Sequence, residues 1–89
     1  MDHNDLKASE FNKIVGRRIL KQRLNKKLTQ TKLAKRLFVT FQQIQKYEKG
    51  TNGISSLRIM QLANFLKVPV VYFFEEFPEY SSEGGKTSC

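Results

Sequence analysis

The sequence predicts an all-α fold, a compact bundle of five short helices in one small domain of 89 residues. Apolar residues recur at the three- and four-residue spacing of amphipathic helices along most of the chain. A Ser or Thr precedes each of the first four expected helices, Gly50 follows the third, and Pro69 precedes the fifth. The stretch 28–50, LTQTKLAKRLFVTFQQIQKYEKG, combines both signals and predicts two short helices joined by a tight turn.

The first expected helix begins after Ser9, a candidate N-cap, and runs to about Leu24. Gly16 inside it costs about 1 kcal/mol relative to Ala, which suggests that another helix packs closely at this position. The apolar stripe of this helix consists of Phe11, Ile14, Val15 and Ile19.

Two threonines predict the starts of the next two helices. The hydroxyl of Thr29 can accept an unpaired backbone N–H of the first turn, and Thr40 can do the same for a helix from Phe41 to Lys49. In this third helix, Ile44 and Tyr47 lie three residues apart and are expected to point inward. The apolar face of the second helix consists of Leu33, Ala34 and Leu37.

The outward face of the third helix is polar and basic. A Gln side chain can donate and accept hydrogen bonds at an adenine edge, and a Lys can reach guanine or a phosphate. Gly50 is expected to end the helix as a left-handed C-cap. Such a pair of helices is typical of a helix-turn-helix whose second helix enters the major groove of DNA. The outward residues are Gln42, Gln45, Lys46 and Lys49, with Phe41 at the exposed N-terminal flank.

Two more helices are expected after the motif. Ser55 or Ser56 can cap the fourth, which runs to about Leu66, and Pro69 suits the first position of a fifth, Val70 to about Glu76. The expected inward residues of the fourth helix are Ile59 or Met60, Leu62, Ala63 and Leu66.

The folded domain is therefore expected to span residues 9–77. Residues 1–8 are expected to form a flexible polar lead, and residues 78–89 are expected to form a disordered acidic tail rich in Ser and Gly.

The net charge of +8 is concentrated in residues 11–74, which contain fourteen Lys and Arg and one acid, Glu48. The flanking residues 1–10 and 75–89 are acidic overall. A phosphate-binding surface requires such a concentration of positive charge. The alternative is a solvated cationic surface that serves solubility.

Short groups of polar, small and apolar residues between about Val15 and Phe74 carry a family pattern. They are Thr29-Gln30, Leu33-Ala34, Val39-Thr40, Ile44, Glu48-Lys49-Gly50, Leu62-Ala63 and Leu66-Lys67-Val68. With these groups the segment resembles the phage-repressor (Cro/repressor, XRE-type) helix-turn-helix family. The resemblance implies a lambda-repressor-like DNA-binding domain.

The resemblance also implies roles for particular residues. Gln30 would hydrogen-bond a phosphate at the N-terminus of its helix. Phe41, Gln42 and Lys46 fall on the family's base-reading positions, and Gln45 shares their outward face. The candidate phosphate-binding residues are Thr29, Gln30, Lys32, Thr40, Gln43, Lys49 and Asn52.

The sequence departs from the family pattern in three places. Phe38 stands where the family usually has a turn glycine, so either the turn is reshaped or a bulky residue adopts a strained conformation. Phe41 can touch a thymine methyl group but cannot form a bidentate hydrogen bond. The loop Thr51–Ser56 contains no Arg or Lys, so the family's minor-groove contacts are not carried over.

Glu48, the isolated acid, lies at the edge of the buried helix face. The resemblance nominates Arg23 as its partner in a partly buried ion pair between the first and third helices. The alternative is a surface carboxylate without a fixed partner.

The fifth helix carries more aromatic residues than one short helix is expected to bury on one face. The alternatives are burial of all of them in the monomer or a homodimer interface, which would place two recognition helices one DNA turn apart. The candidate interface residues are Val70, Val71, Tyr72, Phe74 and Phe77.

The expected function is sequence-specific binding of double-stranded DNA as a transcriptional regulator, a repressor acting as a dimer on a pseudo-palindromic operator. A second hypothesis is a protein-interaction module, such as an antitoxin or co-regulator, that binds a protein partner through its C-terminal segment. A third is RNA binding or unspecific nucleic-acid binding.

An enzyme is not expected. The one histidine, His3, lies in the polar lead, and no paired acid and base, phosphate-binding glycine loop or metal-ligand spacing is present. Gly84-Gly85-Lys86-Thr87 lacks the upstream glycine, strand and helix of a phosphate loop. The sequence thus predicts no catalytic residue, no metal and no cofactor.

The compartment is expected to be a reducing cytoplasm. Cys89 is the one cysteine, so no internal disulfide or cysteine-based zinc site is expected. The sequence shows no signal peptide, and its longest apolar run, Val68–Phe74, is too short to span a bilayer. No membrane partner is expected.

Overall fold

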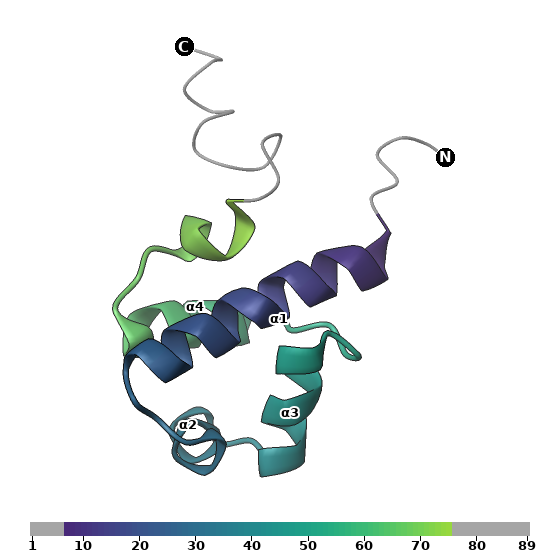
Figure 1. Cartoon of the computed structure of the whole chain (residues 1–89). Helices are drawn as coiled ribbons and strands as arrows, with labels where there is room; N and C mark the ends of the chain where they lie inside the picture. Colours follow the sequence, from purple (N-terminus) through teal and green to yellow (C-terminus); the bar gives the residue numbers. More distant parts are fainter. Residues whose placement is uncertain (1–6, 76–89) are drawn as a thin grey trace.

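The computed structural model describes residues 7–75, which form four α-helices and a short 3₁₀-helix packed together (Figure 1). These described residues contain no strand, and the predicted all-α bundle is confirmed. None of their helices is long and apolar enough to cross a membrane. The elements are α1 (Ala8–Asn25), α2 (Gln30–Leu37), α3 (Phe41–Lys49), α4 (Ser56–Leu66) and η1 (Val70–Phe74).

Three of the predicted N-caps are confirmed, and each hydroxyl accepts a hydrogen bond from the backbone N–H three residues later. Thr29 caps α2, Thr40 caps α3, and Ser55 rather than Ser56 caps α4. The donors are Lys32 at 3.0 Å, Gln43 at 3.1 Å and Arg58 at 3.2 Å.

The prediction that Ser9 caps the first helix is wrong. Helix α1 begins at Ala8, its N-cap is Lys7, and no side chain caps it. Ser9 therefore lies within the first turn, where Glu10 supplies the negative charge that a helix N-terminus favours. Residues 1–6 of the predicted lead, the last two residues of the predicted domain and the whole predicted tail, 78–89, lie outside the described part of the chain.

The fifth element also differs from its prediction, because it is a 3₁₀-helix of five residues instead of an α-helix. Pro69 occupies its N-cap position, and the Pro69 carbonyl accepts the N–H of Tyr72 at 3.0 Å. Short 3₁₀ turns commonly serve as connectors and terminal elements. The predicted end at Glu76 lies outside the described residues.

All five elements contribute side chains to one core. Ile59 is buried and Met60 is exposed, which decides between the two residues proposed for α4. Val15 and Ile19 are buried on α1, whereas Phe11 and Ile14 are half-buried at the edge of its stripe. The fully buried large side chains are Val15, Ile19, Leu33, Leu37, Ile44, Leu62, Leu66 and Phe73.

Gly16 marks the place where α1 lies against α3 (Figure 1). A methyl group added to its Cα would lie 2.6 Å from the carbonyl oxygen of Glu48 and would also overlap that of Tyr47. Only glycine allows this approach without a backbone shift. The close helix packing predicted from Gly16 is therefore confirmed.

Candidate nucleic-acid interface

Two buried side chains on the inner face of α3 hold this helix against the core. Ile44 is fully buried and Tyr47 is buried, as the sequence predicted. Gly50 ends the helix with φ 78°, which confirms the predicted left-handed C-cap. The orientation of α3 about its axis is thus set by its buried face, and this fixes which residues face solvent.

The residues predicted to contact bases lie together on the solvent side of α3. Gln42 and Lys46 are exposed, Phe41 is partly exposed at the N-terminal end, and Gln45 is half-buried. A row of amide and ammonium groups beside an aromatic ring offers hydrogen bonds to base edges and apolar contact to a thymine methyl. The structure brings these four residues together, and their role in base recognition stays a prediction.

The candidate phosphate-binding residues occupy the N-termini of α2 and α3, the last residue of α3 and the loop after it. The Thr29 and Thr40 hydroxyls accept backbone N–H groups as caps, and each can still donate its own hydrogen to a phosphate oxygen. Helix N-termini also carry partial positive charge. Of the remaining candidates, Lys32, Lys49 and Asn52 are exposed, and Gln30 and Gln43 are half-buried.

The predicted ion pair between α1 and α3 is confirmed, and both partners are buried. Arg23 Nε donates to Glu48 Oε2 at 2.6 Å, and Arg23 Nη2 donates to Glu48 Oε1 at 3.2 Å. Arg23 Nη1 also donates to the carbonyl of Leu28 at 2.8 Å. This bidentate geometry is specific to Arg and fixes the last turn of α3 relative to α1.

Gln30 joins this network, because its Nε2 donates to Glu48 Oε1 at 2.9 Å. The sequence suggested a phosphate contact for Gln30 and did not suggest this bond. An amide NH₂ has a second hydrogen, so a phosphate contact is compatible with the bond to Glu48. The network therefore connects α1, α2 and α3 at one point.

Arg58 is a positioning residue that the sequence did not predict. Its Nη1 donates to the carbonyl of Leu37, the last residue of α2, at 2.8 Å and to Gln61 Oε1 at 2.8 Å. The last carbonyls of a helix lack partners within the helix, so a cation there is favourable. The Arg-to-Gln spacing of three along α4 was visible in the sequence, but the contact with α2 was not.

The turn between α2 and α3 contains Phe38 in the left-handed conformation, with φ 58° and ψ 42°. The turn is therefore not reshaped to suit a bulky residue. Instead, Phe38 adopts the strained conformation that a glycine would adopt without strain. The backbone N–H of Val39 donates to the Ala34 carbonyl at 3.0 Å, which closes the helix end. The side chain of Phe38 is 87% exposed.

The aromatic residues of η1 pack within the monomer. Phe73 is fully buried, and Phe74 stacks on Phe11 with 5.7 Å between ring centroids. The guanidinium of Arg18 lies 4.9 Å from the centroid of the Tyr72 ring. Packing in the monomer therefore covers Phe73 completely and leaves Tyr72 and Phe74 half-buried. The homodimer interface expected at Val70, Val71, Tyr72 and Phe74 stays a prediction. Phe77 lies outside the described residues.

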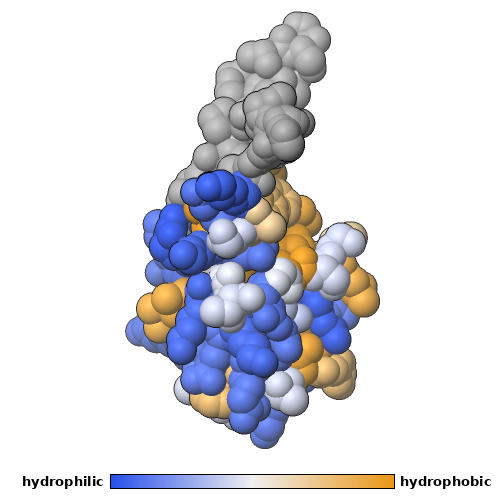
Figure 2. All heavy atoms as spheres, turned by 90° about the vertical axis from the view of Figure 1, so that its right-hand side faces the viewer, coloured by the Kyte–Doolittle hydropathy of each residue, from blue (hydrophilic) through white to orange (hydrophobic). Residues whose placement is uncertain are grey.

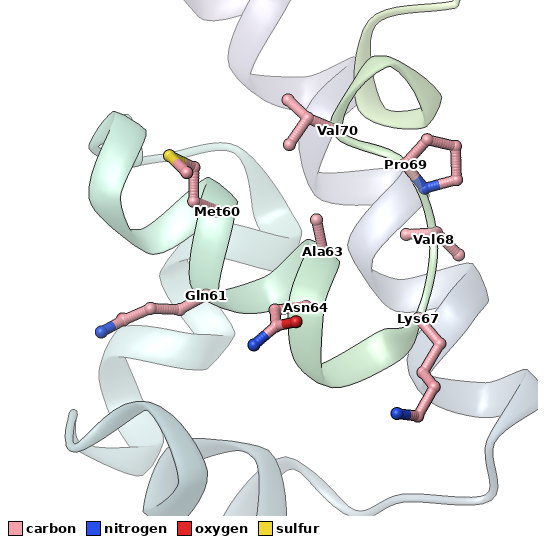
Figure 3. A pocket seen from close by; sticks show the side chains of 8 residues that line it. All are labelled: Met60, Gln61, Ala63, Asn64, Lys67, Val68, Pro69 and Val70. Carbon is pink, nitrogen blue, oxygen red and sulfur yellow. The ribbon is translucent and has the colours of Figure 1, made fainter.

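A different apolar surface lies on α4 and at the start of η1. Leu57 is 60% exposed, Met60 is 61% exposed, and Val70 is partly exposed. Met60 and Val70 line opposite sides of a groove between α4 and the segment that leads into η1 (Figure 3). The groove is separate from α3, since its lining residues are Met60, Gln61, Ala63, Asn64, Lys67, Val68, Pro69 and Val70.

The surface on the α3 side is mainly hydrophilic, with smaller apolar patches (Figure 2). Residues 11–74 contain fourteen basic residues and one acid, and that acid is paired with Arg23. The surface charge of this segment is therefore strongly positive, as binding to phosphates requires. Within the described residues, no three His, Cys, Asp or Glu side chains lie together as metal ligands.

Comparisons with known proteins agree with this geometry. The family model described as helix-turn-helix matches residues 19–73. A protein from Sinorhizobium medicae, described as an uncharacterized HTH-type transcriptional regulator, is 42% identical over 87 residues, which cover 98% of this chain and 60% of the relative. An uncharacterized transcriptional regulator in the ATPase CF(0) region of Rhodospirillum rubrum is 48% identical over 62 residues, which cover 70% of this chain and 57% of that protein.

A solved structure shares the fold. The restriction-modification controller protein C.AhdI from Aeromonas hydrophila superposes with a TM-score of 0.66 and 24% identity over 70% of this chain and 94% of its own. The chain spans about 60% of the length of the first curated relatives that it matches.

Proposed function

The chain belongs to the helix-turn-helix family, and from that membership we propose that it binds double-stranded DNA in a sequence-specific manner as a transcriptional regulator. The observation that supports this proposal most directly is the outward face of α3. Gln42 and Lys46 are exposed on it, while Ile44 and Tyr47 hold the opposite face in the core. Such a helix can lie in the major groove with its polar side chains against base edges.

In the proposed complex, phosphate contacts orient the domain and side chains of α3 select the sequence. Phe41, Gln42, Gln45 and Lys46 contact base edges. Backbone phosphates are bound by Thr29, Gln30, Lys32, Thr40, Gln43, Lys49 and Asn52. Occupation of a promoter in this way represses transcription, and a repressor of this kind acts in the cytoplasm.

We further propose that the protein binds as a homodimer on a pseudo-palindromic operator. Because Tyr72 and Phe74 pack against α1, the exposed apolar side chains Leu57, Met60 and Val70 support an interface on α4 and the start of η1. Two-fold pairing would place two copies of α3 about 34 Å apart, one turn of DNA.

Selection from a random duplex DNA library tests the function. The expected product is an enriched half-site in an inverted repeat whose centres are about 10 base pairs apart. Retention of all duplexes alike, or preference for single-stranded RNA, would reject the proposal.

Two lysine variants test the division between base and phosphate contacts. Lys46→Ala should relax base preference, whereas Lys32→Ala should lower affinity for all duplexes and flatten the salt dependence of binding.

Sedimentation of the protein on the selected duplex tests the dimer. Met60→Glu should convert a 2:1 complex into a 1:1 complex, because it places a carboxylate in the proposed apolar interface. Leu24→Glu on α1 is the matched control, since Leu24 is an equally exposed apolar residue on another helix. A 1:1 complex of the unaltered protein, or equal effects of both variants, would contradict this interface.

A further inference from the structure

Phe38 combines two unfavourable features that packing does not explain. Its backbone adopts the left-handed region with φ 58°, which is costly for a residue with a Cβ and favours glycine. Its ring is 87% exposed, so the side chain gains little from the core in return. A residue that is strained and exposed at once is a candidate for a contact with a ligand.

Two other non-glycine residues share this backbone conformation, and both are lysines. Lys27 has φ 58° and Lys67 has φ 61°, and each follows the end of a helix. A positive side chain near a helix C-terminus interacts favourably with the partial negative charge there. The ring of Phe38 has no charge and no hydrogen-bonding group, so this explanation does not extend to it.

The location of Phe38 points to DNA as the partner. Phe38 precedes Thr40, the cap of α3, and at most about 11 Å of chain separates its Cα from that of Phe41. This distance is within the major-groove width of about 12 Å. The neighbouring turn of α2 carries Lys35 and Arg36, and no acid occurs between residues 11 and 47. The backbone of Phe38 thus lies close to the start of α3, and basic residues precede it in the sequence.

We propose that Phe38 determines specificity by contacting a thymine methyl group in the major groove, beside the base pairs contacted from the N-terminal end of α3. The C5 methyl of thymine is the one apolar group among the base-edge features of the major groove, and a phenyl ring can make only apolar contact there. This inference rests on the proposed function, because it requires α3 to lie on duplex DNA.

Replacement of Phe38 by glycine gives a direct test, because Phe38→Gly removes the ring and suits the backbone at the same time. The variant should unfold at a temperature at least as high as that of the unaltered protein. Its affinity for the duplex selected by the unaltered protein should nevertheless fall about five- to tenfold. Intact folding with weaker binding would assign the loss to the missing contact.

Substitution of each thymine of that duplex by deoxyuridine, which lacks only the methyl group, locates the contact. One such change should weaken the unaltered protein about fourfold and leave Phe38→Gly unaffected. Phe41→Ala is the matched control, because it removes the neighbouring partly exposed ring. This control should keep the sensitivity at the thymine assigned to Phe38.

Two results would overturn the inference. Phe38→Gly could bind the selected duplex and its deoxyuridine versions as tightly as the unaltered protein does. It could also bind all of them more weakly while every deoxyuridine penalty persists. Failure of the unaltered protein to select any duplex would instead reject the proposed function, so the two failures are distinguishable.

Discussion

The two ends of α3 are built differently. At the C-terminal end, Gly50 is buried and Glu48 is held by Arg23 and Gln30. At the N-terminal end, Thr40 and the ring of Phe38 are exposed to solvent. The fold therefore fixes one end of the helix by packing and leaves the other accessible. Gly50 and Phe38 thus share the left-handed backbone conformation for different reasons. Packing against α1 requires it at Gly50, whereas no packing requires it at Phe38.

The largest effect is expected at the fixed end. Gly50→Ala should destabilise the domain by about 3 kcal/mol, because its φ of 78° disfavours a side chain and the new Cβ would lie 2.6 Å from the Cα of Lys13. Urea denaturation measures the loss. A change below about 0.5 kcal/mol would show that the packing does not require glycine there.

The ion pair at the same end should show nearly as large an effect. Removal of one partner, by Arg23→Met or Glu48→Gln, should cost about 3 kcal/mol because it leaves a buried charged group without its partner. The double variant should lose less than the sum of the single losses. Additive losses in the urea-denaturation cycle would mean that the two side chains do not stabilise each other.

A smaller loss is expected at the accessible end. Thr40→Ala should cost about 1 kcal/mol, since it removes the hydroxyl that accepts the N–H of Gln43. Thr40→Ser is the control, because serine keeps the hydroxyl and should retain most of the stability. Equal losses in both variants, measured by thermal unfolding, would exclude the hydrogen bond as the cause.

The smallest effect has the opposite sign. Phe38→Gly should stabilise the domain by about 0.5 kcal/mol, because relief of left-handed strain outweighs the greater freedom of glycine in the unfolded chain. Phe38→Ala, which keeps a Cβ, should not be more stable than the unaltered protein. A loss of stability in the glycine variant would show that the ring contributes to the folded state.

Local chemistry explains which features were predictable from the sequence. Thr40 as a cap and Gly50 as a C-cap depend on a few neighbouring residues, and the inward positions of Ile44 and Tyr47 follow from helical spacing. These predictions were confirmed. The prediction that Ser9 caps α1 was wrong because several residues near a helix start can serve as its boundary, and boundaries are the least determined part of a helix.

The features that the sequence did not predict depend on contacts between distant segments. The bond from Arg58 to Leu37 requires α4 to meet the end of α2. The stacking of Phe74 on Phe11 requires η1 to return to α1, so its aromatic content alone suggested an exposed surface. The roles of the α3 side chains depend on DNA, and neither the sequence nor the fold determines them.

The contact at Gly16 has a consequence for how motion passes through the molecule. Backbone meets backbone there, so no flexible side chain lies between α1 and α3 to absorb a displacement. The two helices should therefore move as one rigid body. A domain attached rigidly to the start of α1 would change the orientation of α3 when it moves, whereas a flexible linker of glycine and serine would leave α3 unaffected.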